Sequence, residues 1–230
     1  GAFFIVEHMS VAVHVMKTVH KLSDKCPPIV IIGTGPVGVQ VAQKLLRENP
    51  NQSLVIYGNE PWEPYNRVQL SLFLAGELDW LGLTESQRIP ESPNVSLVYN
   101  CEVVYIDRGQ GFIIDQLERI QPYDKLILAT GSTPHVPSIP GVDRRHVYRF
   151  RSMDDVNQLL SRQVASRKTV VLGGGLLGLE AARAMQRRHT EVTIIDHSQH
   201  LMNQQLDSDA AELLRDRMMS MAGQALAAQD

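Results

Sequence analysis

The sequence of 230 residues has little cysteine, few aromatic residues and no long apolar run. Its two cysteines, Cys26 and Cys101, form no CxxC or CxxxxC redox pair, no metal-ligand spacing and no disulfide framework. No apolar run reaches the roughly 18 residues of a membrane span. A net charge of -3 favours neither nucleic acid nor an anionic membrane as a partner. We therefore expect a globular protein of the reducing cytoplasm, without a metal site.

The start of the chain differs from a targeting segment. Residues 1–25 begin at Gly1 instead of Met and lack the basic start of a signal peptide. We predict an irregular extension here, outside the fold. The missing initiator Met suggests that the chain is a fragment.

A glycine-rich turn organises the first part of the chain. Four apolar residues, 29–32, lead into Gly33-x-Gly35-x-x-Gly38, and apolar residues then recur at helical spacing up to Leu46. The pattern predicts a buried strand, a tight turn and a helix. The N-terminal amides of such a helix face a pyrophosphate, and the glycines allow the turn and the close approach of the ligand.

Shorter patterns follow this helix. Residues 53–57 read as the next parallel strand, and Asn59 and Glu60 follow at the place where such a unit carries an acidic ribose ligand. Three further elements are expected: a short helix at 69–76, a β-meander within 95–130 that begins with a strand at 95–99, and a buried strand at 125–131.

The glycine pattern returns later in the chain. Residues 169–172 lead into Gly173-x-Gly175-x-x-Gly178 and a helical pattern, and a strand at 191–195 ends at Asp196. Ahead of this copy, Ser152-x-x-Asp155 resembles a capping box and predicts a helix start. The two copies predict an α/β fold of two Rossmann-like, three-layer nucleotide-binding units.

The doubled pattern, with Ala129-Thr130-Gly131 between the copies, resembles the FAD/NAD(P)-dependent pyridine nucleotide–disulfide oxidoreductase superfamily. Residues 60–71 (EPWEPYNRVQLS) are similar to a segment of ferredoxin and rubredoxin reductases, and most of all to that of the large subunit of NADH-dependent nitrite reductase. The resemblance covers roughly residues 28–215. It implies the N-terminal part of an FAD-binding domain at 26–145 and a partial NAD(P)-binding domain at 146–230, both incomplete at the C-terminal side.

The resemblance also implies a set of residues for each cofactor. The FAD set is Gly33, Gly35, Pro36, Gly38, Asn59, Glu60, Arg67, Val103, Ala129, Thr130 and Gly131. The NAD(P)H set is Gly173, Gly175, Leu176, Leu177, Gly178 and Asp196, and Glu180 would lie where nicotinamide meets flavin. Because an acid at position 196 repels a 2′-phosphate, NADH is expected over NADPH, a preference that neighbouring His197 weakens.

Within the FAD set, the implied roles differ. Asn59 stands where the family usually has its ribose-binding glutamate, and Glu60 is the alternative. Arg67 would reach the FAD phosphates or the adenine, and Val103 would meet the adenine through its backbone. Thr130 and Gly131 would border the flavin.

The chain departs from the family at one position near the flavin. Leu72 occupies the place of a flavin-contacting lysine, so no ion pair between that lysine and Glu180 is expected. Paired cysteines are missing as well, which argues against disulfide-reductase chemistry.

Two functions of different classes fit the sequence. The first is an FAD-dependent module that passes hydride from NADH to flavin, and electrons on to a small redox protein or a redox centre. Nitrite reduction itself would require cysteine ligands that the chain lacks. The second is a truncated, non-catalytic nucleotide-binding protein, suggested by residues 218–230, which do not resemble the continuation of the family. A homo-oligomer is compatible with either.

Three of these residues also have explanations that involve no ligand. Asn59 could be an ordinary turn residue, Arg67 a solvated loop charge and Glu180 an acid favoured by the helix dipole.

Overall fold

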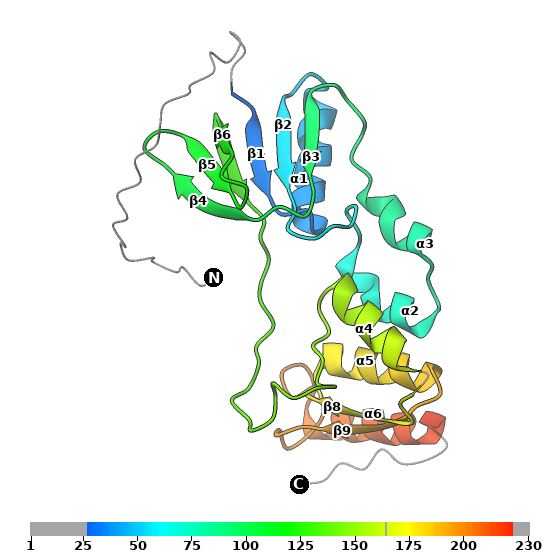
Figure 1. Ribbon diagram of the computed structural model, residues 1–230. Helices are drawn as coiled ribbons and strands as arrows, with labels where there is room; N and C mark the ends of the chain where they lie inside the picture. The colour runs from blue at the N-terminus through cyan, green and yellow to red at the C-terminus, as the bar shows by residue number, and fades with distance from the viewer. Residues whose placement is uncertain (1–26, 164, 223–230) are drawn as a thin grey trace.

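The structure is a computed structural model that describes residues 27–163 and 165–222. In these ranges the chain forms an upper and a lower α/β unit, with short helices between them (Figure 1). The predicted extension at 1–25, Cys26 and the residues after 222 lie outside the described residues.

A four-stranded parallel sheet in the order β3-β2-β1-β7 forms the centre of the first unit. Its strands are β1 (Ile29–Ile32), β2 (Leu54–Tyr57), β3 (Val95–Val98) and β7 (Lys125–Leu128). β1 pairs in register with β2 and with β7, so that Ile29 lies opposite both Leu54 and Lys125. The strand–turn–helix prediction is confirmed, because α1 (Pro36–Glu48) follows β1 directly.

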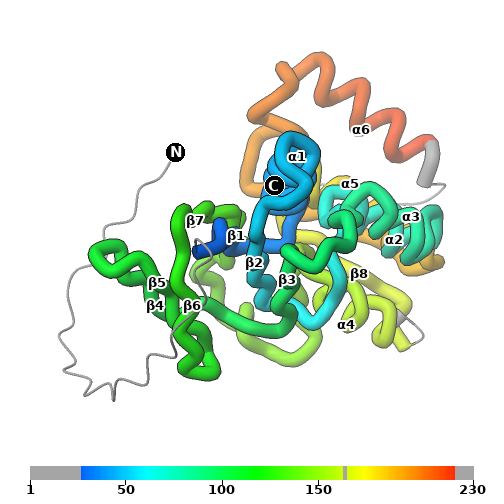
Figure 2. The backbone as a smooth tube through the Cα atoms, turned by 90° about the horizontal axis from the view of Figure 1, so that it is seen from above, coloured from blue at the N-terminus to red at the C-terminus, as the bar shows by residue number. Residues whose placement is uncertain are grey.

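Alternating side chains of β1 create the layers of the first unit. Ile29 and Ile31 pack with Ala42 and Leu46 of α1, while Val30 packs on the opposite face in a core with Tyr57, Cys101 and Ile113. Successive side chains of a strand point to opposite faces, so an apolar run of four residues supplies both cores. Seen from above, the meander lies at one side of the molecule, and α2 and α3 lie at the other (Figure 2).

The meander is shorter than predicted. It contains β4 (Val103–Asp107), β5 (Phe112–Asp115) and β6 (Ile120–Pro122), all antiparallel. The predicted first strand at 95–99 was assigned wrongly, because β3 pairs in parallel with β2. A short apolar run does not tell which sheet it will join.

The predicted buried strand at 125–131 is an edge strand. Among the described residues, β7 pairs only with β1, and Leu128 is 62% exposed. Its apolar sequence resembles that of a central strand, and only the sheet order shows that one edge of β7 has no neighbouring strand among the described residues.

Short helices connect the two units. They are the 3-10 turn η1 (Arg67–Gln69), α2 (Leu70–Ala75), α3 (Trp80–Thr84), the 3-10 turn η2 (Glu85–Gln87) and α4 (Met153–Gln163). The helix predicted at 69–76 is thus confirmed. The capping box is confirmed too, since the Asp155 backbone N–H donates to Ser152 Oγ at 3.2 Å and the Ser152 N–H donates to Asp155 Oδ2 at 2.8 Å.

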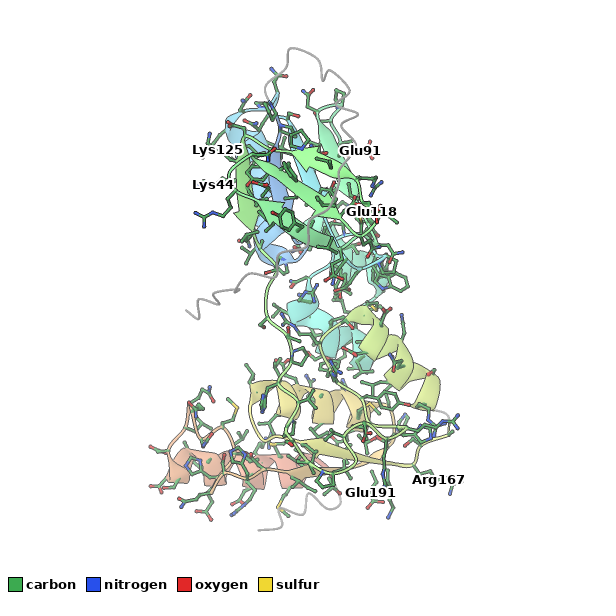
Figure 3. The ribbon with its side chains drawn as sticks, turned by 60° about the vertical axis from the view of Figure 1, so that its left-hand side comes forward. Lys44, Glu91, Glu118, Lys125, Arg167 and Glu191 are labelled. Carbon is green, nitrogen blue, oxygen red and sulfur yellow. The ribbon has the colours of Figure 1, made fainter. Side chains whose placement is uncertain are left out.

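The second unit consists of β8 (Lys168–Leu172), α5 (Leu176–Arg187), β9 (Glu191–Ile195) and α6 (Ser208–Ala222). β8 and β9 pair in parallel, as predicted, and their starts lie together where the Glu191 N–H donates to the Arg167 carbonyl at 2.9 Å (Figure 3). Buried residues of α5 and β9 share one core with residues of α2, α3 and α4. The segment between β2 and β3 therefore packs on the second unit as well as the first.

Candidate functional site

The first glycine turn lies between β1 and α1, and packing fixes two of its three glycines. Gly33 has a φ of +119°, and a Cβ added there would lie 2.2 Å from the carbonyl oxygen of Ala129. A Cβ on Gly38 would lie 2.0 Å from the carbonyl oxygen of Gly33. Both positions therefore require glycine for the turn itself and for the contact of helix with strand.

The middle glycine of this turn faces open space. A Cβ on Gly35 would meet only Arg67 Nε, at 3.6 Å, so the glycine leaves room for something outside the turn. Gly35 is also the N-cap residue of α1 and is followed by Pro36. The first amides of a helix have no partner within it, so this N-terminus suits an anion.

The second glycine turn repeats this geometry between β8 and α5. Gly173 has a φ of +117°, and a Cβ on Gly178 would lie 2.0 Å from the carbonyl oxygen of Gly173. A Cβ on Gly175 would meet no atom within 4 Å. Leu176 and Leu177, which open α5, are 57% and 62% exposed. This helix N-terminus is accessible as well.

A polar residue follows the second strand of each unit. Asn59 follows β2 and is exposed. Asp196 follows β9, its side chain is 14% exposed, and its Oδ2 would lie 2.5 Å from a Cβ on Gly174. His197 Nδ1 lies 3.3 Å from Asp196 Oδ1, and its side chain is almost fully exposed. The carboxylate of the second unit is thus held close to its turn.

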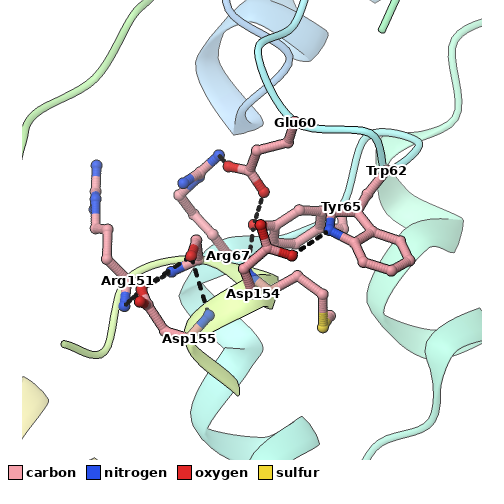
Figure 4. A network of polar contacts seen from close by, with 9 residues as sticks. Glu60, Trp62, Tyr65, Arg67, Arg151, Asp154 and Asp155 are labelled. Carbon is pink, nitrogen blue, oxygen red and sulfur yellow. Dashed lines mark hydrogen bonds and ion pairs between the residues drawn. The ribbon is translucent and has the colours of Figure 1, made fainter. Parts of the chain in front are cut away.

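Glu60 belongs to a polar network beside the first turn (Figure 4). Arg67 Nη2 donates to Glu60 Oε1 at 2.8 Å, and the Tyr65 hydroxyl donates to Glu60 Oε2. The Tyr65 hydroxyl in turn accepts a hydrogen bond from the Met153 N–H, at the start of α4. Burial of the ring and the hydrogen bond to Glu60 raise the pKa of Tyr65 far above its ordinary value. Both carboxylate oxygens of Glu60 are therefore occupied, and Arg67 is fixed beside Gly35.

Sequence reasoning missed Arg151. A Cβ on Gly131, which has a φ of +73°, would lie 3.2 Å from Arg151 Nη2. Arg151 Nε is buried and has no hydrogen-bond partner among the described residues. Thr130, between Ala129 and Gly131, is exposed. No local pattern singles out this arginine, because 20 residues separate it from the glycine that it approaches.

Val103 and Glu180 lie outside the first turn. Val103 begins β4 and packs against the core beneath the meander. Glu180 lies on α5, and its Oε2 accepts a hydrogen bond from Ser71 Oγ of α2 at 3.1 Å. The structure thus gathers Glu60, Arg67 and Ala129 at the first turn, Asp196 at the second, and Glu180 where the units meet.

Cys101 has a structural environment. Its side chain is buried, Arg119 Nη2 lies 3.3 Å from its Sγ, and burial raises the pKa of its thiol. A raised pKa makes a thiol a poor nucleophile. Within residues 27–163 and 165–222, no group of three or more candidate ligands could hold a metal ion. Over the same residues, none of the helices combines the length and apolar character needed to cross a bilayer.

Several curated proteins are similar to this chain in sequence. The chain is 39% identical to "Assimilatory nitrate reductase electron transfer subunit" of Bacillus subtilis (strain 168) over 81% of its length, and 38% identical to "Nitrite reductase [NAD(P)H]" of the same strain over 83%. It is 33% identical to "Rubredoxin-NAD(+) reductase" of Pseudomonas putida over 83%. The chain spans only 24% of each Bacillus protein and 50% of the Pseudomonas one.

Solved structures share its fold. A NAD-dependent persulfide reductase from A. fulgidus matches with a TM-score of 0.77 at 22% identity, over 85% of this chain and 38% of the other. NADH:rubredoxin oxidoreductase from Clostridium acetobutylicum matches with a TM-score of 0.72 at 22% identity, over 86% and 52%. Residues 27–223 match the family described as pyridine nucleotide-disulphide oxidoreductase. With two glycine turns, two α/β units and this match over most of its length, the chain belongs to the pyridine nucleotide-disulphide oxidoreductase family.

Proposed function

We propose that the chain is the nucleotide-binding module of an FAD-dependent NAD(P)H oxidoreductase. The observation that carries the proposal is the pair of open turns, at Gly35 and at Gly175, each at the N-terminus of a helix. Two such turns could bind two dinucleotides, one in each unit. Because the units meet through α2 and α5, the flavin and nicotinamide ends of the two dinucleotides could lie close together.

The first turn is proposed to hold FAD. The open space at Gly35 fits a pyrophosphate, with Pro36 and the amides of α1 behind it. Arg67 is oriented by Glu60 and supplies a positive charge beside the turn. Arg151 adds a second guanidinium at Gly131, where its Nε has no protein partner among the described residues. A guanidinium held beside the N-terminus of α1 and a second one at Gly131 favour an anionic ligand.

Smaller contacts complete the proposed FAD set. Asn59 is exposed and can hydrogen-bond a ribose hydroxyl, whereas the carboxylate of Glu60 is already engaged by Tyr65 and Arg67. We therefore assign the ribose to Asn59 and the orientation of Arg67 to Glu60. Val103 is proposed to meet the adenine through its backbone. Ala129, Thr130 and Gly131 are proposed to border the flavin side.

The second turn is proposed to hold NAD(P)H. Gly175 leaves the space for the pyrophosphate, and Leu176, Leu177 and Gly178 open the helix behind it. Asp196 lies close to Gly174 and is proposed to accept hydrogen bonds from the adenosine ribose. Because its charge repels a 2′-phosphate, NADH is the preferred form.

The protein's own part in the reaction is positioning. A bound flavin supplies the ability to accept hydride from reduced nicotinamide and to pass electrons on. Glu180 is proposed to lie at the point where the two ring systems meet. The acceptor is proposed to be a redox centre or a small redox protein, on the strength of the nitrite reductase and rubredoxin reductase relatives, and the setting to be the cytoplasm.

A flavin spectrum followed by anaerobic NADH titration tests this function. Purified chain mixed with FAD should retain flavin absorbance after desalting, and NADH should bleach it. Arg67→Gln should weaken FAD retention. Arg47→Gln is a matched control, because it removes the same charge at the far end of α1, about 20 Å along a helix of this length.

Two results would count against the proposal. Absence of flavin uptake by the wild-type chain would overturn it. Nucleotide binding without NADH oxidation, with ferricyanide as the acceptor, would instead favour the non-catalytic nucleotide-binding protein.

A further inference from the structure

A row of side chains on α5 faces α2 where the two units meet. Glu180, Arg183 and Arg187 follow one another at helical spacing, and all three contact α2 or the residues after it. Arg183 Nη2 and Arg187 Nε reach Glu77 Oε1 at 3.1 Å and 2.9 Å. Arg188 Nε donates to the Leu74 carbonyl at 2.6 Å. We call this contact the α2–α5 seam.

The two ends of the α2–α5 seam differ in their surroundings. The end at Glu77 is near the surface, since Arg183 and Arg187 have side chains more than half exposed. The other end is the contact of Ser71 with Glu180, and Ser71 is only 9% exposed. Glu180 also lies two residues after Gly178, on the turn of α5 that follows the open second glycine turn.

Ser71 is the one hydrogen-bond donor to the Glu180 carboxylate within the described parts of the chain. The neighbouring residue, Leu72, has no polar side chain. A carboxylate in a half-buried place needs such a donor to keep one orientation, because hydrogen bonds to a charged group are the stronger ones. The donor comes from α2, which directly follows the η1 turn that carries Arg67, so this contact links the two glycine turns.

We infer that Ser71 is a positioning residue, whose hydroxyl holds Glu180 toward the nicotinamide end of a dinucleotide bound at the second glycine turn. The inference rests on the proposed function, and deepens it by naming how the first unit acts on the second nucleotide. The ADP part of that dinucleotide would be held by Gly173–Gly178 and Asp196, and Ser71 is not among these residues. The Ser71 hydroxyl should therefore affect the binding of the nicotinamide end and not that of the ADP part.

The experiment compares the affinities of the purified chain for NAD⁺ and for ADP-ribose, which lacks nicotinamide. Isothermal calorimetry measures both. Ser71→Ala should weaken NAD⁺ binding about fivefold, the worth of one hydrogen bond, and leave ADP-ribose binding unchanged. Ser71→Thr, which keeps the hydroxyl, should restore NAD⁺ affinity. In a Glu180→Ala background, which removes the acceptor, Ser71→Ala should cause no further loss of NAD⁺ affinity.

A matched variant separates positioning from a loosened seam. Glu77→Gln weakens the far end of the α2–α5 seam, and should increase hydrogen exchange in α2 while leaving the ratio of NAD⁺ to ADP-ribose affinity unchanged. If Glu77→Gln changes that ratio as Ser71→Ala does, the inference is overturned. The inference is also overturned if Ser71→Ala lowers the affinities for NAD⁺ and ADP-ribose equally, or lowers neither. If the wild-type chain binds neither ligand, the proposed function itself fails.

Discussion

The first and second glycine turns share a backbone shape and differ in their surroundings. Gly33 and Gly173 have φ angles of +119° and +117°, and the helix glycine of each turn would place a Cβ 2.0 Å from the carbonyl oxygen of the first. Around Gly33, however, a Cβ would lie 2.2 Å from the Ala129 carbonyl oxygen, whereas a Cβ on Gly173 would meet nothing within 4 Å.

The difference reflects the sheet that holds each turn. In the first unit, β7 lies beside β1, and its end reaches Gly33 through Ala129. In the second unit, β8 has only β9 as a neighbour among the described residues, and Val170 and Leu172 are 58% and 57% exposed. Gly33 and Gly173 therefore have the same backbone conformation, but only Gly33 is also required to be glycine by a neighbouring strand.

The largest loss of stability is expected from replacing the first glycine of each turn, Gly33 or Gly173. Gly33→Ala adds backbone strain of about 1–3 kcal/mol and a backbone clash of similar size, whereas Gly173→Ala adds the strain alone. Amide hydrogen exchange of β1 and β8 measures the two effects separately. Equal losses of protection in the two variants would contradict the difference in surroundings.

The helix glycines test the part that the turns share. Gly38→Ala and Gly178→Ala each place a Cβ on a backbone carbonyl at 2.0 Å, so both should destabilise their own unit by about 1–3 kcal/mol. The same exchange measurement checks this prediction. A loss confined to one of the two would show that the helix–strand contact is not equivalent in the two turns.

A buried carboxylate belongs to the first unit. Asp115 is fully buried, and although burial raises its pKa, hydrogen bonds from Arg119, Leu117 and Cys101 outweigh this and lower it below 3.8. Its stabilisation is present above pH 3.8 and is lost as the pH falls through the folded pKa. Asp115→Asn should lower the free energy of unfolding by about 1–3 kcal/mol at neutral pH.

Urea unfolding at several pH values measures this effect. The difference between Asp115→Asn and wild type should shrink as the pH falls below 3.8. Exposed Asp124 provides the control, since Asp124→Asn should change stability little. A difference that stays constant down to low pH would contradict the role of the charge.

The smallest effect on stability is expected at the middle glycines. Gly35 and Gly175 have φ angles of -74° and -80°, which alanine adopts without strain, so Gly35→Ala and Gly175→Ala should leave stability within about 1 kcal/mol of wild type. Gly35→Ala should nevertheless weaken the binding of FAD, and Gly175→Ala the binding of NAD⁺, because the added methyl group fills the open space at the turn. Calorimetry with each ligand measures this: Gly35→Ala should leave the affinity for NAD⁺ unchanged, and Gly175→Ala should leave the affinity for FAD unchanged.

Local sequence was sufficient to predict the turns and the capping box. Glycine spacing, the apolar run of β1 and the helical pattern of α1 act over a few residues, so neighbours along the chain determine them. Predictions that depended on distant neighbours were less successful. The strand at 95–99 was assigned to the meander instead of the parallel sheet, and the edge position of β7 was not foreseen.

The candidate site was predictable to the same extent. Arg67 and Asp196 were expected from the family resemblance, and the structure places Arg67 beside Gly35 and Asp196 beside Gly174. Asn59, which the sequence left as an alternative to Glu60, is exposed after β2. Arg151 carried no signal, because its place next to Gly131 depends on the course of the connector between the units. Glu60 could not be assigned from sequence either, since its partners Tyr65 and Arg67 are revealed only by the packing of the loop.

By itself, the sequence determined that this protein has two glycine turns of one shape, each between a strand and a helix, because backbone conformation there depends on which residues lack a Cβ. Tertiary structure alone decided what surrounds each turn and that Ser71 meets Glu180. Those contacts join residues as far as 109 positions apart, and only the packing of α2 on α5 brings such residues together.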